Sequence, residues 1–155
     1  TKPIDGLTLS ASYYEIEDLA DGITTEEQLQ EGGAWGAEFA AGNFTVGFGK
    51  SYLAPETTTA TRALGAATVE YYENTGASIA VAVNDALSLS YSMEDGEANY
   101  QTSATQAYDI EMKSVQAAYS LGGATLSIAR ADYDNVGYTN GIDTTETIIA
   151  MSFAF

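Results

Sequence analysis

Acidic side chains are the groups in this sequence best able to do chemistry. Asp and Glu number 22 against 5 Lys and Arg, which gives a net charge of -17. We therefore expect no nucleic-acid partner, because its phosphates would be repelled, whereas cations would be attracted. The chain has no His and no Cys. Ser-His-Asp and Cys-His catalysis, and metal binding through imidazole or thiolate, are thereby excluded.

One acidic segment carries Asp18, Asp21, Glu26, Glu27 and Glu31. Carboxylate oxygens are the ligands that Ca²⁺ and other divalent cations prefer. The spacing does not match an EF-hand, whose loop needs ligands at fixed positions around a glycine. A solvated surface loop is the simpler interpretation, and a loop-bound divalent cation is the alternative.

Two further carboxylates, Glu38 and Glu146, fall among small residues on one side of an alternating pattern. Paired carboxylates perform glycoside hydrolysis when their separation is fixed. One such pair among 22 acidic residues is expected by chance, and nothing in the sequence sets their separation. We interpret the two as fixed charges and expect no enzyme activity and no cofactor.

The elements that carry these side chains show a period of two. Leu87, Leu89, Tyr91 and Met93 alternate with serines at 88, 90 and 92, and this pattern has no helical equivalent. The same reading predicts eight strands in all. The other seven contain residues 7–13, 35–41, 44–48, a segment ending at 83, 115–121, 126–128 and 149–155.

Short and long connections alternate between these strands. Three are predicted to be two-residue turns, Gly42-Asn43, Asn84-Asp85 and Gly122-Gly123, because their residue types tolerate positive φ. The long ones run over residues 18–33, 54–65, 95–107 and 135–143. Transmembrane β-barrels have short turns on one side and longer loops on the other, and they cross with strands of roughly 9–11 residues. The sequence thus predicts an all-β, antiparallel transmembrane β-barrel, while the lack of a long apolar run excludes membrane helices.

Three places interrupt the alternation. Ile110 and Met112 are out of phase with Val115, which predicts a bulge near Lys113-Ser114. The residues Asn74-Thr75-Gly76 are either a bulge or loop residues within the fourth strand. Arg130 shares parity with Leu126 and Ile128, which directs it toward lipid unless the strand shifts phase or the guanidinium lies at the rim.

The side opposite the apolar residues is built mainly of Gly, Ala, Ser and Thr. Such residues leave the interior of a closed eight-stranded barrel unfilled, but they suit a wall that lines water in a barrel of 16–18 strands. The pore-lining candidates are Glu38, Ser88, Ser90, Ser92, Gln116, Arg130 and Glu146. Amphipathic rings at the membrane interfaces are predicted for Tyr13, Trp35, Tyr91, Tyr119, Tyr133 and Phe155.

Four segments resemble the general bacterial porins of the alphaproteobacterial type. They are residues 3–8 (Pro-Ile-Asp-Gly-Leu-Thr), 83–91, 119–126 and the closing 151–155 (Met-Ser-Phe-Ala-Phe). The terminal Phe155, with Phe153 two residues before it, is similar to the signal read by the outer-membrane barrel assembly machinery. The resemblance covers the whole chain as one domain, 1–155, and aligns it with the C-terminal half of such a porin.

This resemblance implies a 16-stranded homotrimer in the bacterial outer membrane that passes ions and small hydrophilic solutes. The inward-folded constriction loop of the family lies in the other half, and basic wall residues carry over only to Arg130 and Arg62. Lipid and lipopolysaccharide are the surrounding partners, with divalent bridging to the acidic loop as one option. The excess of acid predicts a modest cation preference.

Two other functions fit parts of the sequence. A closed eight-stranded outer-membrane barrel acting as an anchor or adhesin through its outer loops would match the strand count. A soluble ligand-binding β-barrel would also be all-β, but it would not account for the apolar outer stripe or the terminal Phe.

Overall fold

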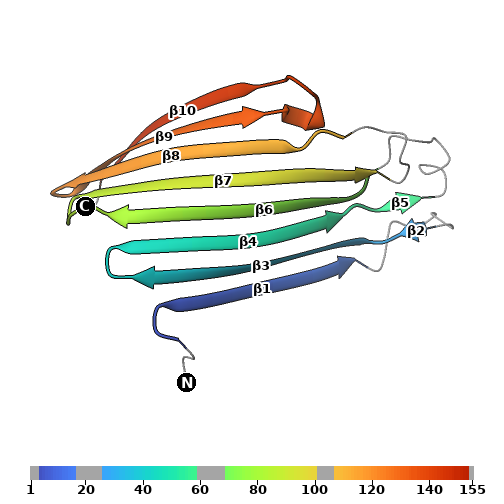
Figure 1. The fold of residues 1–155 in the computed structure, drawn as a ribbon, viewed down its shortest axis with the longest axis horizontal. Helices are drawn as coiled ribbons and strands as arrows, with labels where there is room; N and C mark the ends of the chain where they lie inside the picture. Colours follow the sequence, from blue (N-terminus) through green and yellow to red (C-terminus); the bar gives the residue numbers. More distant parts are fainter. Residues whose placement is uncertain (1–3, 17–25, 59–68, 101–106, 154–155) are drawn as a thin grey trace.

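A computed structural model describes residues 4–16, 26–58, 69–100 and 107–153 of the chain, and most of them lie in β-strands (Figure 1). Eight strands form one antiparallel sheet: β1 (Leu7–Ile16), β3 (Gln30–Ala41), β4 (Phe44–Ala54), β6 (Val69–Ala82), β7 (Leu87–Tyr100), β8 (Ile110–Leu121), β9 (Ala124–Asp134) and β10 (Thr144–Phe153). The strands lie side by side in chain order. The predicted all-β, eight-stranded antiparallel architecture is therefore confirmed.

Two smaller elements lie in the connections. The short strands β2 (Glu26–Gln28) and β5 (Thr57–Thr58) pair with each other as a separate two-stranded sheet. A single 3-10 turn, η1 (Val136–Tyr138), lies between β9 and β10. No helix in the described part of the chain is long and apolar enough to span a membrane.

The main sheet is a single layer without a conventional hydrophobic core. Among the described residues, only Ala54 and Ala98 are buried hydrophobic residues, at 7% and 4% exposure. Large apolar side chains remain exposed along the sheet, including Leu9 at 68% and Ile149 at 70%. Soluble domains normally cover such a face with a second layer, and the described residues provide none.

The two edges of the sheet are β1 and β10. In the described residues each of them pairs on one side only, β1 with β3 and β10 with β9. The sheet is consequently open, and these eight strands do not close on themselves. Closure into a barrel, which the sequence predicted, is not seen among the described residues.

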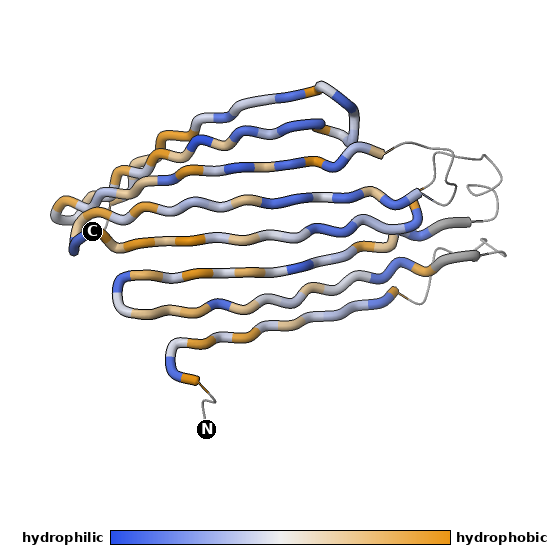
Figure 2. The backbone as a smooth tube through the Cα atoms, in the orientation of Figure 1, coloured by the Kyte–Doolittle hydropathy of each residue, from blue (hydrophilic) through white to orange (hydrophobic). Residues whose placement is uncertain are grey.

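The strands extend further toward the long-loop end than the sequence predicted. β7 continues to Tyr100, although a loop was expected from Asp95, and β3 begins at Gln30 inside the expected 18–33 loop. Because the side chains in these extensions are polar, the sequence pattern resembles a loop there. The backbone still pairs, Gly96 with Asn74 and Ala98 with Tyr72. Hydrophobic residues gather toward the tight-turn end and hydrophilic ones toward the long-loop end (Figure 2).

Two of the three predicted tight turns are confirmed. Gly42-Asn43 and Gly122-Gly123 connect their strands directly, and the first residue of each turn adopts a positive φ, 59° at Gly42 and 61° at Gly122. The Asn84-Asp85 prediction is wrong in length, because β6 ends at Ala82 and β7 begins at Leu87. The side chain of Asn84 accepts hydrogen bonds at 2.9 Å from the N–H groups of Ala86 and Leu87, which stabilises the longer turn.

The predicted bulge near Lys113-Ser114 is also wrong, and residues 74–76 form neither a bulge nor a loop. Lys113 and Ser114 pair in unbroken register with β7 and with β9. Residues 74–76 likewise keep a regular register, and the irregularity of β6 lies between Val69 and Tyr71. Ile110 and Met112 are out of phase because apolar side chains occupy the other face near this strand end, so no change in backbone register is needed.

Candidate functional site

The register of the ladders sorts the side chains onto two faces. One row crosses all eight strands and consists of Thr8, Glu38, Gly47, Ser78, Ser92, Ser114, Ala131 and Glu146. Adjacent partners in a ladder point to the same side of the sheet. We call the side that contains this row the small-residue face and the opposite side the apolar face.

Three glycines lie side by side in the next row of the small-residue face. Gly36 pairs with Gly49, and Gly49 pairs with Gly76. Because none of them carries a side chain, the sheet surface is hollowed here, and the hollow has a volume of about 560 Å³. There is room for a side chain above Gly76, because a Cβ added there would come no closer than 3.7 Å to another heavy atom, the carbonyl oxygen of Met93.

The predicted polar wall residues lie on the small-residue face. Ser88, Ser90 and Ser92 occupy alternate positions of β7, and Gln116 is the ladder partner of Ser90. The side-chain amide of Gln116 donates a hydrogen bond of 3.4 Å to the hydroxyl of Ser114. This face therefore offers short hydroxyl and amide groups with little bulk, a surface suited to contact with water.

Carboxylates are the charges of this face. Glu38 and Glu146 point to it as predicted, although five strands separate β3 from β10. At about 4.8 Å per strand step the two are on the order of 29 Å apart along the sheet, which is far beyond the separation of a glycosidase pair. Glu94 shares the face because it pairs with Gly76 and Met112. Sequence reasoning missed Glu94, yet it continues the parity of the serines at 88, 90 and 92.

The apolar face presents a continuous hydrophobic surface near the tight turns. One row across it reads Phe44, Val81, Leu89, Ala117, Ile128 and Ile149. Neighbouring rows add Phe39, Val46, Ile79 and Val115. Exposed apolar patches on soluble monomers seldom exceed a few hundred Å², and this face continues across the whole width of the sheet.

Arg130, a predicted pore-lining candidate, does not share a face with the other candidates. β9 keeps its phase, so Arg130 lies on the apolar face between Val115 and Thr147. Its guanidinium pairs with Asp132 at 3.2 Å, and Asp132 also accepts a hydrogen bond of 2.6 Å from Thr145. The pairing satisfies the charge along the strand, with both residues on the same side.

All three described basic residues share this placement. Lys50 pairs with Glu73, and Lys113 pairs with Glu111 at 3.0 Å, both at the border of the apolar face toward the long loops. Among the described strand residues of the main sheet, the small-residue face therefore carries Glu38, Glu94 and Glu146 and no Lys or Arg. The separation of charge between the two faces is not visible in the overall composition.

The aromatic residues predicted at membrane interfaces are divided between the two faces of the sheet, and their position at an interface stays a prediction. Tyr13, Trp35, Tyr91 and Tyr119 lie on the apolar face, and the Trp35 ring contacts that of Phe48 with 5.5 Å between centroids. Tyr133 is the exception, because it pairs with Met112 and Thr144 on the small-residue face. The sequence placed it by its closeness to a strand end, which does not determine the face.

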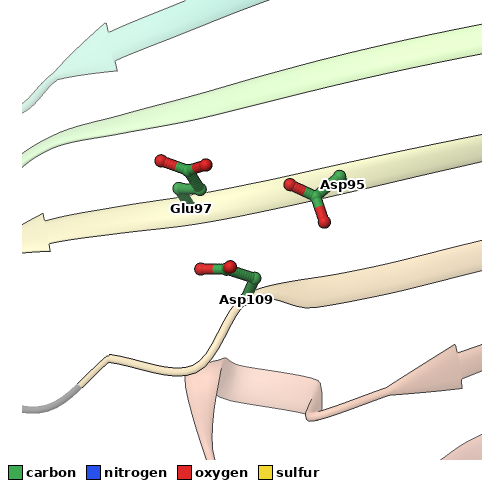
Figure 3. Close-up of side chains that lie close together, drawn as sticks. All are labelled: Asp95, Glu97 and Asp109. Carbon is green, nitrogen blue, oxygen red and sulfur yellow. The ribbon is translucent and has the colours of Figure 1, made fainter.

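The acidic residues cluster at the long-loop end. Asp95 and Glu97 of β7 and Asp109, just before β8, have carboxylate oxygens within 4.8 Å of one another (Figure 3). All three side chains are exposed. Oxygen donors at this spacing are of the kind that divalent cations bind, but the cluster differs from the acidic segment singled out in the sequence.

Several predicted residues lie outside the described part of the chain or only partly in it. Asp18, Asp21, Arg62 and Phe155 are outside the described residues, and the backbone of Glu26 and Glu27 forms β2. Phe153, the other half of the predicted assembly signal, lies on the apolar face at the end of β10, where it pairs with Ala124. The loop-bound divalent cation stays a prediction.

No protein-family model matches this chain, and no curated protein is significantly similar to it. The functional argument therefore depends on the sheet and its two faces.

Proposed function

We propose that this chain forms part of the wall of a water-filled outer-membrane channel through which ions and small hydrophilic solutes diffuse passively. The sheet would lie in the bilayer with its apolar face toward lipid and its small-residue face toward the lumen. Strands of 10 to 14 residues are long enough for this, since a tilted crossing takes roughly 9–11.

The observation that carries the proposal is the uncovered apolar face of a single-layer sheet. A soluble protein would have to bury this surface against a second layer, whereas a bilayer supplies apolar contact directly. The hydrophobic part of the apolar face also ends where a membrane-facing surface should end. It ends toward the long loops at a border of ion pairs and acidic side chains, as expected where hydrocarbon gives way to the polar interface.

The opposite face supports the channel part of the proposal. Its Gly, Ala and Ser residues fill too little space to pack an eight-stranded barrel, and they form no second hydrophobic contact surface. A wall in contact with water tolerates such residues. The hydroxyl pair of Ser120 and Thr125, 2.9 Å apart, is the kind of short polar contact this wall contains.

The open edges favour a larger barrel. The N–H of Ala40 donates to the carbonyl of Gly6 at 2.9 Å. By the alternation of antiparallel ladders, the backbone groups of Leu7, Leu9, Ala11, Tyr13 and Glu15 then point to the free edge. Unpaired backbone groups in hydrocarbon cost several kcal/mol each, so further strands must pair with both edges. The porin resemblance suggests 16 strands in total, three such barrels per assembly, and Phe153 as part of the assembly signal.

Ion preference follows from the charges of the two faces. Glu38, Glu94 and Glu146 face the proposed lumen, and each described basic residue faces away from it. Fixed negative charge raises the local cation concentration within about a Debye length, roughly 10 Å at 0.1 M salt. A modest cation preference is the expected result.

The test is the current through the native protein in a planar lipid bilayer under a salt gradient. Stable ohmic steps with a reversal potential of the sign for cation preference would support the proposal. Folded, membrane-inserted protein that passes no current would overturn it, and steps with anion preference would overturn its electrostatic part.

A further inference from the structure

The connection between β9 and β10 folds across the small-residue face. The Tyr138 ring of η1 contacts the Tyr72 ring of β6, with centroids 5.5 Å apart and planes tilted by 35°. Tyr72 faces the small-residue side, because its ladder partners are Leu53 and Ala98 in the row that contains Gly32. Two strands, β7 and β8, lie between β6 and β9. The connection contacts β8, and the two tyrosine side chains bridge the remaining distance.

The connection is held in this position by its own hydrogen bonds. The Asn135 side chain donates to the carbonyl of Asp109, before β8, at 3.0 Å, and accepts from the N–H of Gly141 at 3.1 Å. The Asp143 carboxylate accepts from the N–H of Asn135 at 3.2 Å. Residues 135–143 are therefore tied to the wall at β8 and fixed in shape, rather than extending away from the sheet.

The backbone at Tyr138 shows that this placement has a cost. Tyr138 adopts φ of 58°, the left-handed region that bulky residues avoid. Such conformations cost on the order of 1–3 kcal/mol and persist where surrounding contacts determine them. The Tyr72 contact is one of these. Burial raises the pKa of the Tyr138 phenol, and the phenols of Tyr72 and Tyr100 raise it further, so the ring lies among other tyrosines.

Strand β7, which lies next to β6 near this contact, is covered at its long-loop end. Ala98 of β7, the ladder partner of Tyr72, is 4% exposed, although the same face is open at mid-strand. Gly96, two residues earlier on the same face, is also buried. The long-loop end of the small-residue face is thus more covered and more aromatic than its centre, where the Gly36–Gly49–Gly76 row leaves a hollow.

We propose that Tyr138, seated on Tyr72, forms an aromatic constriction that determines which solutes pass along the small-residue face. This inference rests on the proposed channel function and adds a size filter at its long-loop mouth. The two rings act as one unit: removing either ring opens the space that the pair fills and widens the mouth, while the Asn135 hydrogen bonds keep the connection in place. Bulky solutes are excluded there, and the selectivity between small ions is set elsewhere, by the carboxylates.

Single-channel conductance and polymer exclusion test the constriction. Tyr138→Ala and Tyr72→Ala should each raise the conductance and admit a larger neutral polymer, and the double variant should add nothing to the larger single effect. Tyr138→Phe keeps the ring and should behave as the unaltered protein. Tyr71→Ala, at the neighbouring position on the other face, is the matched control and should change neither property.

The outcomes separate the two proposals. If the unaltered protein forms no channel, the proposed function fails. If it conducts normally and the conductance and polymer cutoff of the Tyr138→Ala and Tyr72→Ala channels equal its own, the constriction is refuted while the channel stands. Equal increases for Tyr71→Ala and Tyr72→Ala would also refute it, because the effect would then be independent of the face.

Discussion

Placing a charge on alternate faces of one strand tests the assignment of the two faces. Leu89 lies in the middle of the apolar part of β7, with Val81 and Ala117 as its ladder partners. Its neighbour in sequence, Ser90, points to the other face between Ala80 and Gln116. The pair Leu89→Arg and Ser90→Arg therefore introduces the same group at nearly the same depth and changes only the side of the sheet.

The expected magnitudes differ widely if the sheet lies in a bilayer. An arginine facing lipid costs about 2–4 kcal/mol near the middle of the membrane and much less near its surfaces. The same residue facing a water-filled lumen should cost less than about 1 kcal/mol, since exposed substitutions usually stay near ±0.5 kcal/mol. We predict that Leu89→Arg lowers the free energy of unfolding by about 2–4 kcal/mol and that Ser90→Arg leaves it nearly unchanged.

The assay is reversible urea unfolding in lipid vesicles, followed by the fluorescence of Trp35, the only tryptophan of the chain. The unaltered protein supplies the reference, and the slope of free energy against urea shows whether both variants unfold from the same state. Equal losses for the two variants would refute the assignment of faces. A larger loss for Ser90→Arg would reverse it.

Two further predictions concern the proposed lumen. Glu146→Gln should lower the cation-to-anion permeability ratio about twofold at 0.1 M salt and hardly at 1 M. A cation passing about 8 Å from the carboxylate is stabilised by roughly 0.2 kcal/mol after screening, and an anion is destabilised by as much. Reversal potentials measure this ratio, and an equal effect of Arg130→Gln, on the other face, would contradict the prediction. Gly76→Phe should reduce the conductance because the ring enters the hollow beside Gly49, and a Cβ at position 76 meets no atom closer than 3.7 Å. Thr75→Phe, on the apolar face, is its control. Equal conductance of the two variants would exclude the hollow from the conducting path.

The alternation in the sequence was sufficient to predict the sheet because each strand contrasts apolar with small residues. The Leu87–Met93 segment shows why: one face of β7 is apolar and the other is serine, so the period and the faces are both readable. Strand ends were harder to locate. Asp95, Glu97 and Asn99 continue β7 as a paired strand, but their polarity resembles a loop because this part of the sheet extends beyond the apolar band.

Site residues could be predicted where the alternation along one strand determines the face of a side chain. They could not be predicted where a contact depends on how distant segments fold together. Glu38, Glu146 and the serines of β7 followed from parity, and Glu94 could have been found the same way. The face of Arg130 was also indicated by its parity, but it was retained as a pore candidate because a phase shift or a position at the rim was left open and because the porin resemblance places basic residues on the pore wall. The Tyr72–Tyr138 contact had no signal, since it joins two distant segments through a turn whose shape depends on the Asn135 hydrogen bonds.

Accessibility of single cysteines along β7 tests the central claim, that the small-residue face lines a water-filled path, most directly. The chain contains no cysteine, so Cys introduced at positions 87 to 92 in turn can be modified by a charged, water-soluble thiol reagent while the channel conducts in a bilayer. If the proposed wall is correct, modification of a cysteine that replaces Ser88, Ser90 or Ser92 reduces the current. Modification of a cysteine that replaces Leu87, Leu89 or Tyr91 leaves the current unchanged. A response without alternation, or one confined to Leu87, Leu89 and Tyr91, would contradict it.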